Sequence, residues 1–247
     1  MRRQHDAAAT FGESSMITLY DRMARGHTQS GWLDSRHTFS FGSYFAPART
    51  GFRSLRVINE DRVIPGAGFP PHGHKDMEII TYVLAGALEH RDSLGNGSII
   101  RPGDVQRMCA GTGISHSEFN ASRVDPVHFL QIWILPARHG LAPGYEQRHF
   151  AETDKRDHLR LVGDPDGKDG AITIHQNVRL YAACINTGHT IEHVIAPNRR
   201  AWMQLARGAA TLNGHEMKEG DGAALDEEDT VQVTAQADCE LLLLDLD

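Results

Sequence analysis

The sequence predicts an all-β protein in which two antiparallel β-barrels of similar design follow each other along the chain. Short runs of apolar and β-branched residues alternate with glycine-containing turns throughout the 247 residues. No segment has the long amphipathic period of a helix. Two stretches of the chain also resemble each other in the order of their strands and turns. These observations favour many short strands built as a repeated module.

Two segments predict strands directly. Phe129–Leu135 is apolar on both faces and lies between Pro126 and Pro136, which is typical of a strand buried on both sides. Leu88–Ile100 is expected to form a hairpin, because Leu94–Gly97 at its centre supplies residues that tolerate positive φ in a tight turn. Both features are typical of antiparallel sheets.

A weak internal repeat predicts two barrels. Val83–Ala87 resembles Leu205–Ala209, and Arg101–Asp104 resembles Lys218–Asp221, so that each half has a hairpin followed by a Gly-Asp corner. Proline, glycine and charged residues gather between the two halves. We therefore expect a loose extension over 1–15 with Met16 as the natural start, an N-terminal barrel over 16–136, linker and turns over 137–170, and a C-terminal barrel over 171–247.

Composition excludes several classes of function. The 25 Lys and Arg against 32 Asp and Glu give a net charge of −7, which argues against direct nucleic-acid binding. The longest apolar stretch, Ile79–Leu88, is far shorter than the roughly 18 residues of a membrane span. Cys109, Cys184 and Cys239 are widely spaced and are expected to be free thiols in a reducing, cytoplasmic setting. We expect Cys109 to be a small buried residue and not a nucleophile.

Two pairs of polar residues have the spacing of metal ligands. His72 and His74 are two residues apart, so their imidazoles lie on one face if the segment is a strand. His116 and Glu118 repeat this geometry with an imidazole and a carboxylate. Three nitrogens and one anionic oxygen suit a divalent transition metal and leave coordination positions free for chemistry. The net positive charge left on the ion favours an anionic oxygen ligand such as an enolate.

Spacing alone leaves two choices open. Glu78 competes with Glu118 for the fourth ligand position, because it shares strand parity with His72 and His74. The carboxylate that does not bind the ion is expected to accept a hydrogen bond from an imidazole. His37, in a His-Thr-Phe-Ser-Phe-Gly string, is also a candidate for the surroundings of the site.

The motifs resemble those of a known family. Gly66-x5-His72-x-His74-x3-Glu78 is similar to the first cupin motif, and Gly103-x7-Gly111 with His116-x3-Asn120 is similar to the second. Both depart from the general pattern: seven residues separate Glu78 from Gly86, Cys109 stands where proline is preferred, and four residues separate Gly111 from His116. These departures resemble the pirin family specifically. So do the strings at 37–42, 89–97, 113–118 and 130–134, and the resemblance covers Met16 to Asp247.

The resemblance implies a bicupin, two barrels packed face to face, in which His72, His74, His116 and Glu118 hold the metal. Glu78 then becomes a residue of the barrel face or a hydrogen-bonding neighbour of a ligand. Aligning the halves on Gly86 and Gly208 places Val194, Ala196 and Arg200 opposite His72, His74 and Glu78. The second barrel is therefore expected to lack ligands, and the chain to bind one metal ion.

The pirin resemblance also implies an activity. Two-barrel members are associated with quercetin 2,3-dioxygenase activity, in which a flavonol and dioxygen react with release of carbon monoxide. We expect Fe as the metal, while Mn, Co, Ni, Cu and Zn also suit the ligands. Glu118 is the candidate base for the flavonol proton. Phe39, Phe41 and Trp133 are candidates for the apolar walls of a flavonol pocket, with plain core packing as the alternative.

Two other functions stay open. Some pirins act as iron-dependent redox sensors or transcriptional co-regulators, which would require a protein partner. The sequence has no basic localisation cluster, because Arg2-Arg3 and Arg199-Arg200 are only pairs. A metal-dependent isomerase or sugar-binding cupin would share the fold. Loss of flavonol absorbance with oxygen uptake separates the dioxygenase from both.

Overall fold

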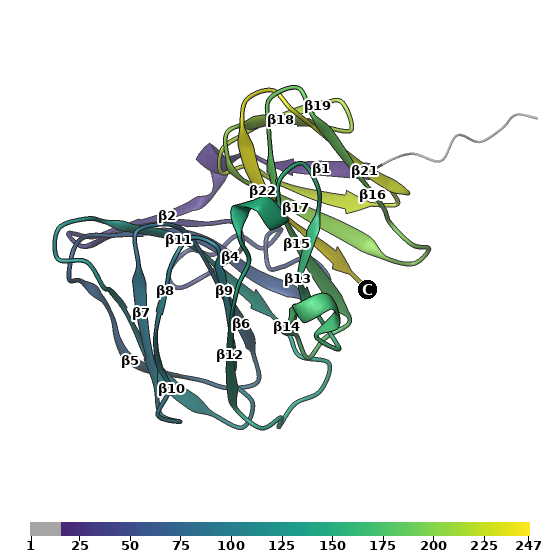
Figure 1. Ribbon diagram of the computed structural model, residues 1–247. Coiled ribbons are helices and arrows are strands. Elements are labelled where there is room, and N and C mark those ends of the chain that lie inside the picture. Colours follow the sequence, from purple (N-terminus) through teal and green to yellow (C-terminus); the bar gives the residue numbers. More distant parts are fainter. Residues whose placement is uncertain (1–15) are drawn as a thin grey trace, which may run out of the picture.

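The computed structural model describes residues 16–247, and the predicted N-terminal extension lies outside this range. The all-β, two-barrel prediction is confirmed: the described chain forms strands and short 3-10 turns, which gather into two lobes (Figure 1). None of the described helices has the length and apolar character needed to cross a membrane. The 3-10 turns are η1 (Arg22–Ala24), η2 (Glu152–Asp154) and η3 (Lys168–Gly170).

The first barrel is a seven-stranded sheet facing a four-stranded sheet. The larger sheet has the order β12-β9-β6-β11-β4-β3-β2, and the smaller has the order β5-β10-β7-β8. The strands of the larger sheet are β2 (Gly26–Gln29), β3 (Leu33–His37), β4 (Leu55–Val63), β6 (Glu78–Ala85), β9 (Asp104–Cys109), β11 (Val127–Ile134) and β12 (Gly144–His149). Those of the smaller sheet are β5 (Gly68–His74), β7 (Leu88–Asp92), β8 (Gly97–Ile100) and β10 (Ile114–Asn120).

The second barrel repeats this plan. Its larger sheet has the order β1-β20-β17-β22-β15-β13-β14, and its smaller sheet has the order β16-β21-β18-β19. The strands of the larger sheet are β1 (Met16–Tyr20), β13 (Arg160–Asp164), β14 (Ile172–Thr173), β15 (Val178–Ile185), β17 (Arg200–Arg207), β20 (Gly222–Asp226) and β22 (Cys239–Leu246). Those of the smaller sheet are β16 (Thr190–Val194), β18 (Ala209–Leu212), β19 (His215–Lys218) and β21 (Thr230–Ala235).

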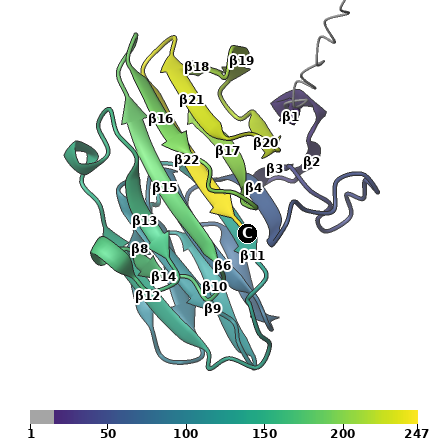
Figure 2. The ribbon, with the colours of Figure 1, turned by 90° about the vertical axis from the view of Figure 1, so that its right-hand side faces the viewer.

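The two larger sheets pack against each other and form the core between the barrels (Figure 2). Tyr82 and Leu130 of the first barrel and Trp202 and Leu244 of the second belong to one buried apolar cluster. Each of these side chains is at most 1% exposed. Burial of this apolar face stabilises the pairing of the barrels, because sheet faces of this kind cannot remain in water. The predicted face-to-face arrangement is therefore confirmed.

The predicted repeat has a backbone basis in two glycines. Gly86 directly follows β6 with a φ of +77°, and Gly208 directly follows β17 with a φ of +78°. At both positions a Cβ atom would collide with backbone, at Pro126 in the first barrel and at Asp238 in the second. Only glycine satisfies both the positive φ and the close approach. The hairpin that follows Gly86, β7 with β8, is the one predicted for Leu88–Ile100.

The predicted domain bounds differ from the observed sheets in two segments of the chain. β1 precedes the first barrel in sequence but pairs with β20 of the second, as its purple ribbon shows in Figure 1. β12 lies within 137–170, where linker and turns were expected, and pairs with β9 of the first barrel. β13, in the same segment, belongs to the second barrel. β1 and β12 are the outermost strands of their sheets and cover the edges of β20 and β9, which would otherwise expose unpaired backbone groups.

The interiors of the two barrels differ. The second barrel is filled by one apolar cluster that includes Met203, Leu205 and Val233. The first barrel has two smaller clusters, one around Phe129 and one around Met108. Polar side chains lie inside the first barrel, on β4, β5, β10 and β11, and they define the candidate site.

Candidate metal centre

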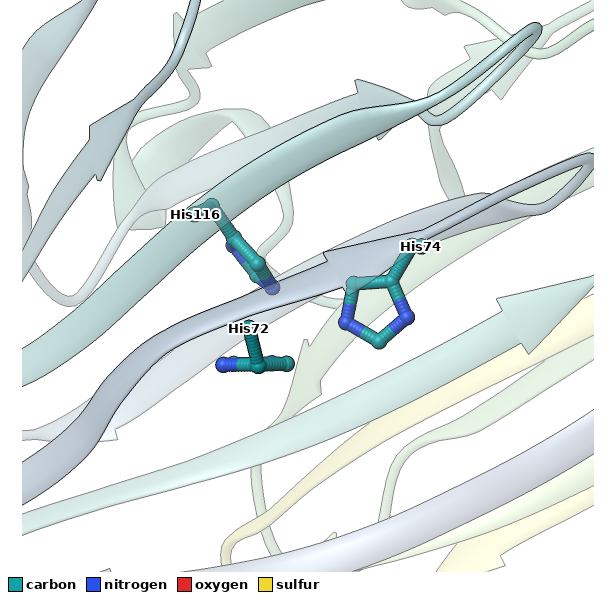
Figure 3. Close-up of side chains that lie close together, drawn as sticks. All are labelled: His72, His74 and His116. Carbon is teal, nitrogen blue, oxygen red and sulfur yellow. The ribbon is translucent and has the colours of Figure 1, made fainter.

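Three histidines meet between β5 and β10 inside the first barrel. The strands are antiparallel, with His116 opposite His72 and Ile114 opposite His74. Figure 3 shows the three imidazoles gathered at this pair of strands. Their ring centroids are 4.5–4.9 Å apart, and one ligand nitrogen from each lies within 4.8 Å of the others. The structure therefore brings together the three imidazoles that strand parity predicts.

The nitrogens of this cluster fit a metal ion. The Nε2 atoms of His74 and His116 are buried and have no hydrogen-bond partner. The Nδ1 atom of His72 donates to the Pro70 carbonyl oxygen at 2.8 Å, which leaves Nε2 as the free lone pair. Buried polar atoms without a partner are costly, and a bound cation removes that cost. The donor set suits a divalent transition metal.

Burial keeps two of these imidazoles neutral. Desolvation, followed by the nearby His72, lowers the pKa of His74 to about 4 and that of His116 to about 3. Only a neutral imidazole carries the lone pair that binds a metal. At neutral pH both side chains are therefore ready to act as ligands without releasing a proton.

Glu118 lies on the same face of β10 as His116. Gln131 Nε2 donates to both carboxylate oxygens, at 3.0 and 2.9 Å, and the Thr81 hydroxyl lies 3.5 Å from one of them. Burial raises the pKa of Glu118, although the Gln131 hydrogen bonds oppose this. Its carboxylate lies within 4.8 Å of ligand atoms of His116 and His90, but does not belong to the three-histidine group. Its place as the fourth ligand stays a prediction.

His90 was not predicted for the site, yet it is fully buried beside His116. It lies on β7, directly opposite Glu118 in the register with β10. Its Nδ1 atom is 3.5 Å from His116 Nδ1, and its Nε2 atom is 3.1 Å from an oxygen of Asp92. The alternation of Leu88, His90 and Asp92 along the hairpin is the sequence signal that could have placed it on the inner face.

A cavity of about 230 Å³ extends from the histidines. Phe41 and Trp133 lie in its wall, and their ring centroids are 5.4 Å apart. The ring centroid of Trp133 is also 4.9 Å from that of His74. His37 lines the cavity as well, and its Nδ1 atom is 2.9 Å from Asn59 Oδ1. The structure thus places three of the predicted neighbours of the site around one pocket.

Asp61 is a second pocket residue that sequence reasoning missed. It lies on β4, is 4% exposed, and one of its carboxylate oxygens has no hydrogen-bond partner. Burial, opposed by a hydrogen bond from Ser35 and reinforced by Glu118, raises its pKa to about 7. Its neighbours in sequence are also acidic or charged, so nothing in the local pattern sets it apart. The pocket therefore contains two buried carboxyl groups.

The placement of Glu78 beside the metal ligands is wrong. Its carboxylate contacts His175 Nδ1 at 3.1 Å and Arg107 Nε at 3.8 Å, on the face of β6 opposite the pocket. The residue that faces the pocket is Ile79. The chain turns between His74 and Glu78, with Asp76 at a φ of +49°, so that parity does not carry from β5 to β6.

The placement of Phe39 in the pocket wall is also wrong. Phe39 is 1% exposed and packs against Trp202 and Tyr20, with ring centroids 5.1 and 6.0 Å away. It belongs to the core between the barrels, and the alternative of plain packing holds for it. Phe41, only two residues further on, lies in the pocket wall, because the backbone has left the strand after His37.

The second barrel lacks the ligand set. The predicted alignment is correct for Arg200, which begins β17 as Glu78 begins β6, but it is off by one residue at the counterparts of His72 and His74. His193 pairs with Val231 as His72 pairs with His116, so His193 and not Val194 is the counterpart of His72. Val194 is 74% exposed, on the outer face. The counterparts of His74, His116 and Glu118 are Ile195, Val231 and Val233, all of which are buried and aliphatic. A bulge between His116 and Glu118 causes the offset.

Fold and site together define a two-barrel protein of the cupin class with a three-histidine centre in its first barrel. The pirin family model matches residues 20–134, and a model described as the quercetinase C-terminal cupin domain matches residues 161–246. A protein of Escherichia coli K12 named quercetin 2,3-dioxygenase is 46% identical over 94% of this chain and 99% of its own length. This chain belongs to the pirin family.

Two further comparisons bear on the site. The crystal structure of the bacterial pirin YhhW from Escherichia coli in complex with nickel(II) is 46% identical, covers 94% of this chain and 99% of its own, and has a TM-score of 0.89. A relative from Pasteurella multocida, 41% identical over 90% of this chain and 95% of its own length, carries the dioxygenase activity in its name as a provisional assignment.

Proposed function

We propose that this pirin is a metal-dependent dioxygenase that cleaves the heterocyclic ring of flavonols such as quercetin, with release of carbon monoxide. The observation that carries the proposal is the pair of buried, partnerless imidazole nitrogens of His74 and His116 at the base of an aromatic-walled pocket. The name of the Escherichia coli relative, quercetin 2,3-dioxygenase, supports the same substrate class.

The proposed cofactor is one divalent transition metal ion held by His72, His74, His116 and Glu118. Iron is the expected ion, and manganese, cobalt, nickel, copper and zinc suit the same donors. When bound, the ion would provide an open position for the deprotonated flavonol and would promote its reaction with dioxygen. Glu118 is proposed as the fourth ligand because it lies on the same strand face as His116, with a carboxylate oxygen within 4.8 Å of a His116 nitrogen.

The pocket residues would orient the substrate. Phe41 and Trp133 provide flat apolar surfaces suited to a planar aromatic ring system, and Asp61 and His37 add polar groups to the lining of the same pocket. The cavity of about 230 Å³ is smaller than the roughly 300–1,000 Å³ of pockets that enclose a whole drug-sized ligand. We therefore expect the protein to enclose the part of the flavonol that carries the 3-hydroxyl group and to leave the pendant ring near the mouth.

Glu118 is the proposed base for the 3-hydroxyl proton. A base must lie within hydrogen-bond reach of the group it deprotonates, and Glu118 lines the same cavity as the histidines. Its raised pKa increases its proton affinity, since burial disfavours its charged form. Gln131 holds both carboxylate oxygens and so fixes the direction of the carboxylate.

The test is an assay of the metal-loaded protein with quercetin. We expect loss of the flavonol absorbance together with oxygen uptake, and neither change after removal of the metal by a chelator. A metal-loaded protein that binds quercetin but consumes no oxygen would contradict the proposal and would favour a binding function with a protein partner.

A further inference from the structure

A second group of metal-donor side chains lies outside the pocket. Glu78, Cys109 and His175 each place one donor atom within 4.8 Å of the other two, the same limit that the three-histidine group meets. The group lies on the face of β6 that points away from the pocket. None of its members contributes to the proposed dioxygenase centre.

Three separate segments converge on this group. Glu78 is the first residue of β6 and Cys109 the last of β9, and the two are directly paired in the sheet of the first barrel. His175 follows β14, a strand of the second barrel's sheet, and its Nδ1 and backbone nitrogens lie 3.1 and 3.2 Å from one oxygen of Glu78. The group therefore joins the two barrels.

The donors suit a thiophilic divalent ion. Thiolate, imidazole and carboxylate are the three ligand types that Zn²⁺ takes in proteins. Glu78 is 0% exposed, and its second carboxylate oxygen has no hydrogen-bond partner. The His175 side chain is 38% exposed and lines a surface cavity of about 550 Å³, so solvent reaches this ligand, and water is the proposed fourth ligand.

The charges around the group balance when an ion is present. Without an ion the Cys109 thiol keeps its proton, because burial and the Glu78 carboxylate raise its pKa to about 12. A bound divalent ion displaces that proton, while the N–H of His175 shifts from Nδ1 to Nε2. Arg107, 3.8 Å from Glu78, and Glu146, 3.4 Å from Arg107, complete the surroundings. The two positive charges of the ion and that of Arg107 then cancel the three negative charges of Glu78, Glu146 and the thiolate.

We propose that Glu78, Cys109 and His175 form a second metal site, which binds one Zn²⁺ or similarly thiophilic ion and links the barrels. This inference goes beyond the proposed function and does not depend on it. The site is distinct from the interior of the second barrel, where the counterparts of the first-barrel ligands are mostly aliphatic. A chain saturated with such an ion would hold two ions, one in the pocket and one between the barrels.

Cobalt titration of the full-length protein tests the proposal. A thiolate bound to Co²⁺ gives a sulfur-to-metal charge-transfer band in the near ultraviolet, and the pocket centre has no thiolate ligand, so the band reports only this site. Starting from protein whose pocket centre is already loaded with Co²⁺, we expect the band to grow until one further equivalent per chain is bound in the parent, and to be absent in Cys109→Ser. Cys184→Ser, which removes a thiol outside the group, is the matched control and should keep the band.

His175→Ala provides a second variant that leaves the buried residues in place. Because loss of even an outer hydrogen-bonding partner weakens metal binding by 10–100-fold, loss of this ligand should raise the Co²⁺ concentration at the band midpoint by at least about 100-fold. The proposal is overturned by a parent protein without the band, by a band that persists in Cys109→Ser, or by a His175→Ala midpoint equal to that of the parent. None of these readouts depends on dioxygenase activity.

Discussion

The Nδ1 atom of His116 lies 3.5 Å from the Nδ1 atom of His90, whose other ring nitrogen is 3.1 Å from a carboxylate oxygen of Asp92. The His90 and Asp92 side chains are both 0% exposed. Asp92 is held in turn by the Asn96 side chain, at 2.9 and 3.1 Å. The proposed ligand His116 thus begins a buried chain that ends in the turn of a hairpin. Such chains fix the tautomer and the direction of a metal-binding imidazole.

His90→Gln tests this chain. We expect it to weaken metal binding by about 10–100-fold, because the ring of His116 loses the partner that orients it. The optical spectrum of the Co²⁺-substituted pocket centre should shift as well, which a purely structural defect would not cause. His215→Gln, on the exposed strand β19, is the control. Unchanged metal affinity and an unchanged spectrum in His90→Gln would show that His90 does not orient His116.

Removal of a ligand tests the centre itself. His72→Ala and His116→Ala should each lower the affinity for the pocket ion by at least about 100-fold and abolish quercetin turnover, because each removes a proposed ligand and loss of even an outer hydrogen-bonding partner weakens metal binding by 10–100-fold. Metal analysis under conditions that leave the thiol site unloaded gives the measurement. His139→Ala, whose side chain is 81% exposed, should behave as the parent. Retention of a full equivalent in either ligand variant would show that the ion lies elsewhere.

Glu118→Gln separates the two proposed roles of Glu118, metal ligand and general base. The amide preserves the shape of the side chain and can keep one of the two hydrogen bonds that Gln131 Nε2 donates, so we expect a folded protein that still binds metal with reduced affinity. Turnover at saturating metal should fall by about 10²–10⁴-fold, the usual contribution of a positioned base. Glu216→Gln on the exposed part of β19 is the matched control. Turnover at the parent rate would assign the base role to another group.

Phe39→Ala should mainly lower stability, whereas Phe41→Ala should mainly raise the KM for quercetin. Phe39 is buried between the barrels, so its truncation should lower the free energy of unfolding by about 3–5 kcal/mol and leave the KM for quercetin unchanged. Phe41 lines the pocket, so its truncation should raise KM with a smaller loss of stability. Denaturant titration and steady-state kinetics give the two measurements. A raised KM in Phe39→Ala would indicate that Phe39 lines the pocket after all.

Asp61→Asn tests the buried carboxyl of the pocket in the metal-free protein. The pKa of Asp61 is raised by burial from 3.8 to about 7, so the folded state holds this proton more tightly than the unfolded state. The stability that this provides is complete below pH 4, falls between pH 4 and 7 and is lost above the folded pKa. The asparagine variant lacks this loss, so relative to the parent it should gain on the order of 3 kcal/mol of unfolding free energy between about pH 4 and pH 8. Denaturant titrations at both pH values measure it, and an equal difference at both would contradict the raised pKa.

Strand parity explains why the three-histidine centre could be predicted. His72 and His74 lie on one strand and His116 on its direct neighbour, so a period of two places all three side chains on one face. The same argument failed for Glu78, because the turn at 75–77 transfers the chain to another sheet. Parity holds within a strand and carries no information across a turn whose conformation is unknown.

The missed features depend on contacts between segments that are distant in sequence. His90 meets His116 only because β7 pairs with β10, and β1 joins the second barrel only because β20 leaves an edge beside it. The strand in 144–149 has no fully buried residue, so its apolar content was too low to reveal it. The bulge between His116 and Glu118 likewise shifted the alignment of the second barrel by one residue.

The most direct test of the central claim is a reaction of the metal-loaded protein with quercetin under isotopically labelled dioxygen, with the product analysed by mass spectrometry and the gas phase assayed for carbon monoxide. The account predicts that the cleaved product contains both atoms of one dioxygen molecule and that one carbon monoxide is released per flavonol, both effects being lost in His116→Ala. A product with one labelled oxygen or none, or cleavage without carbon monoxide, would contradict it.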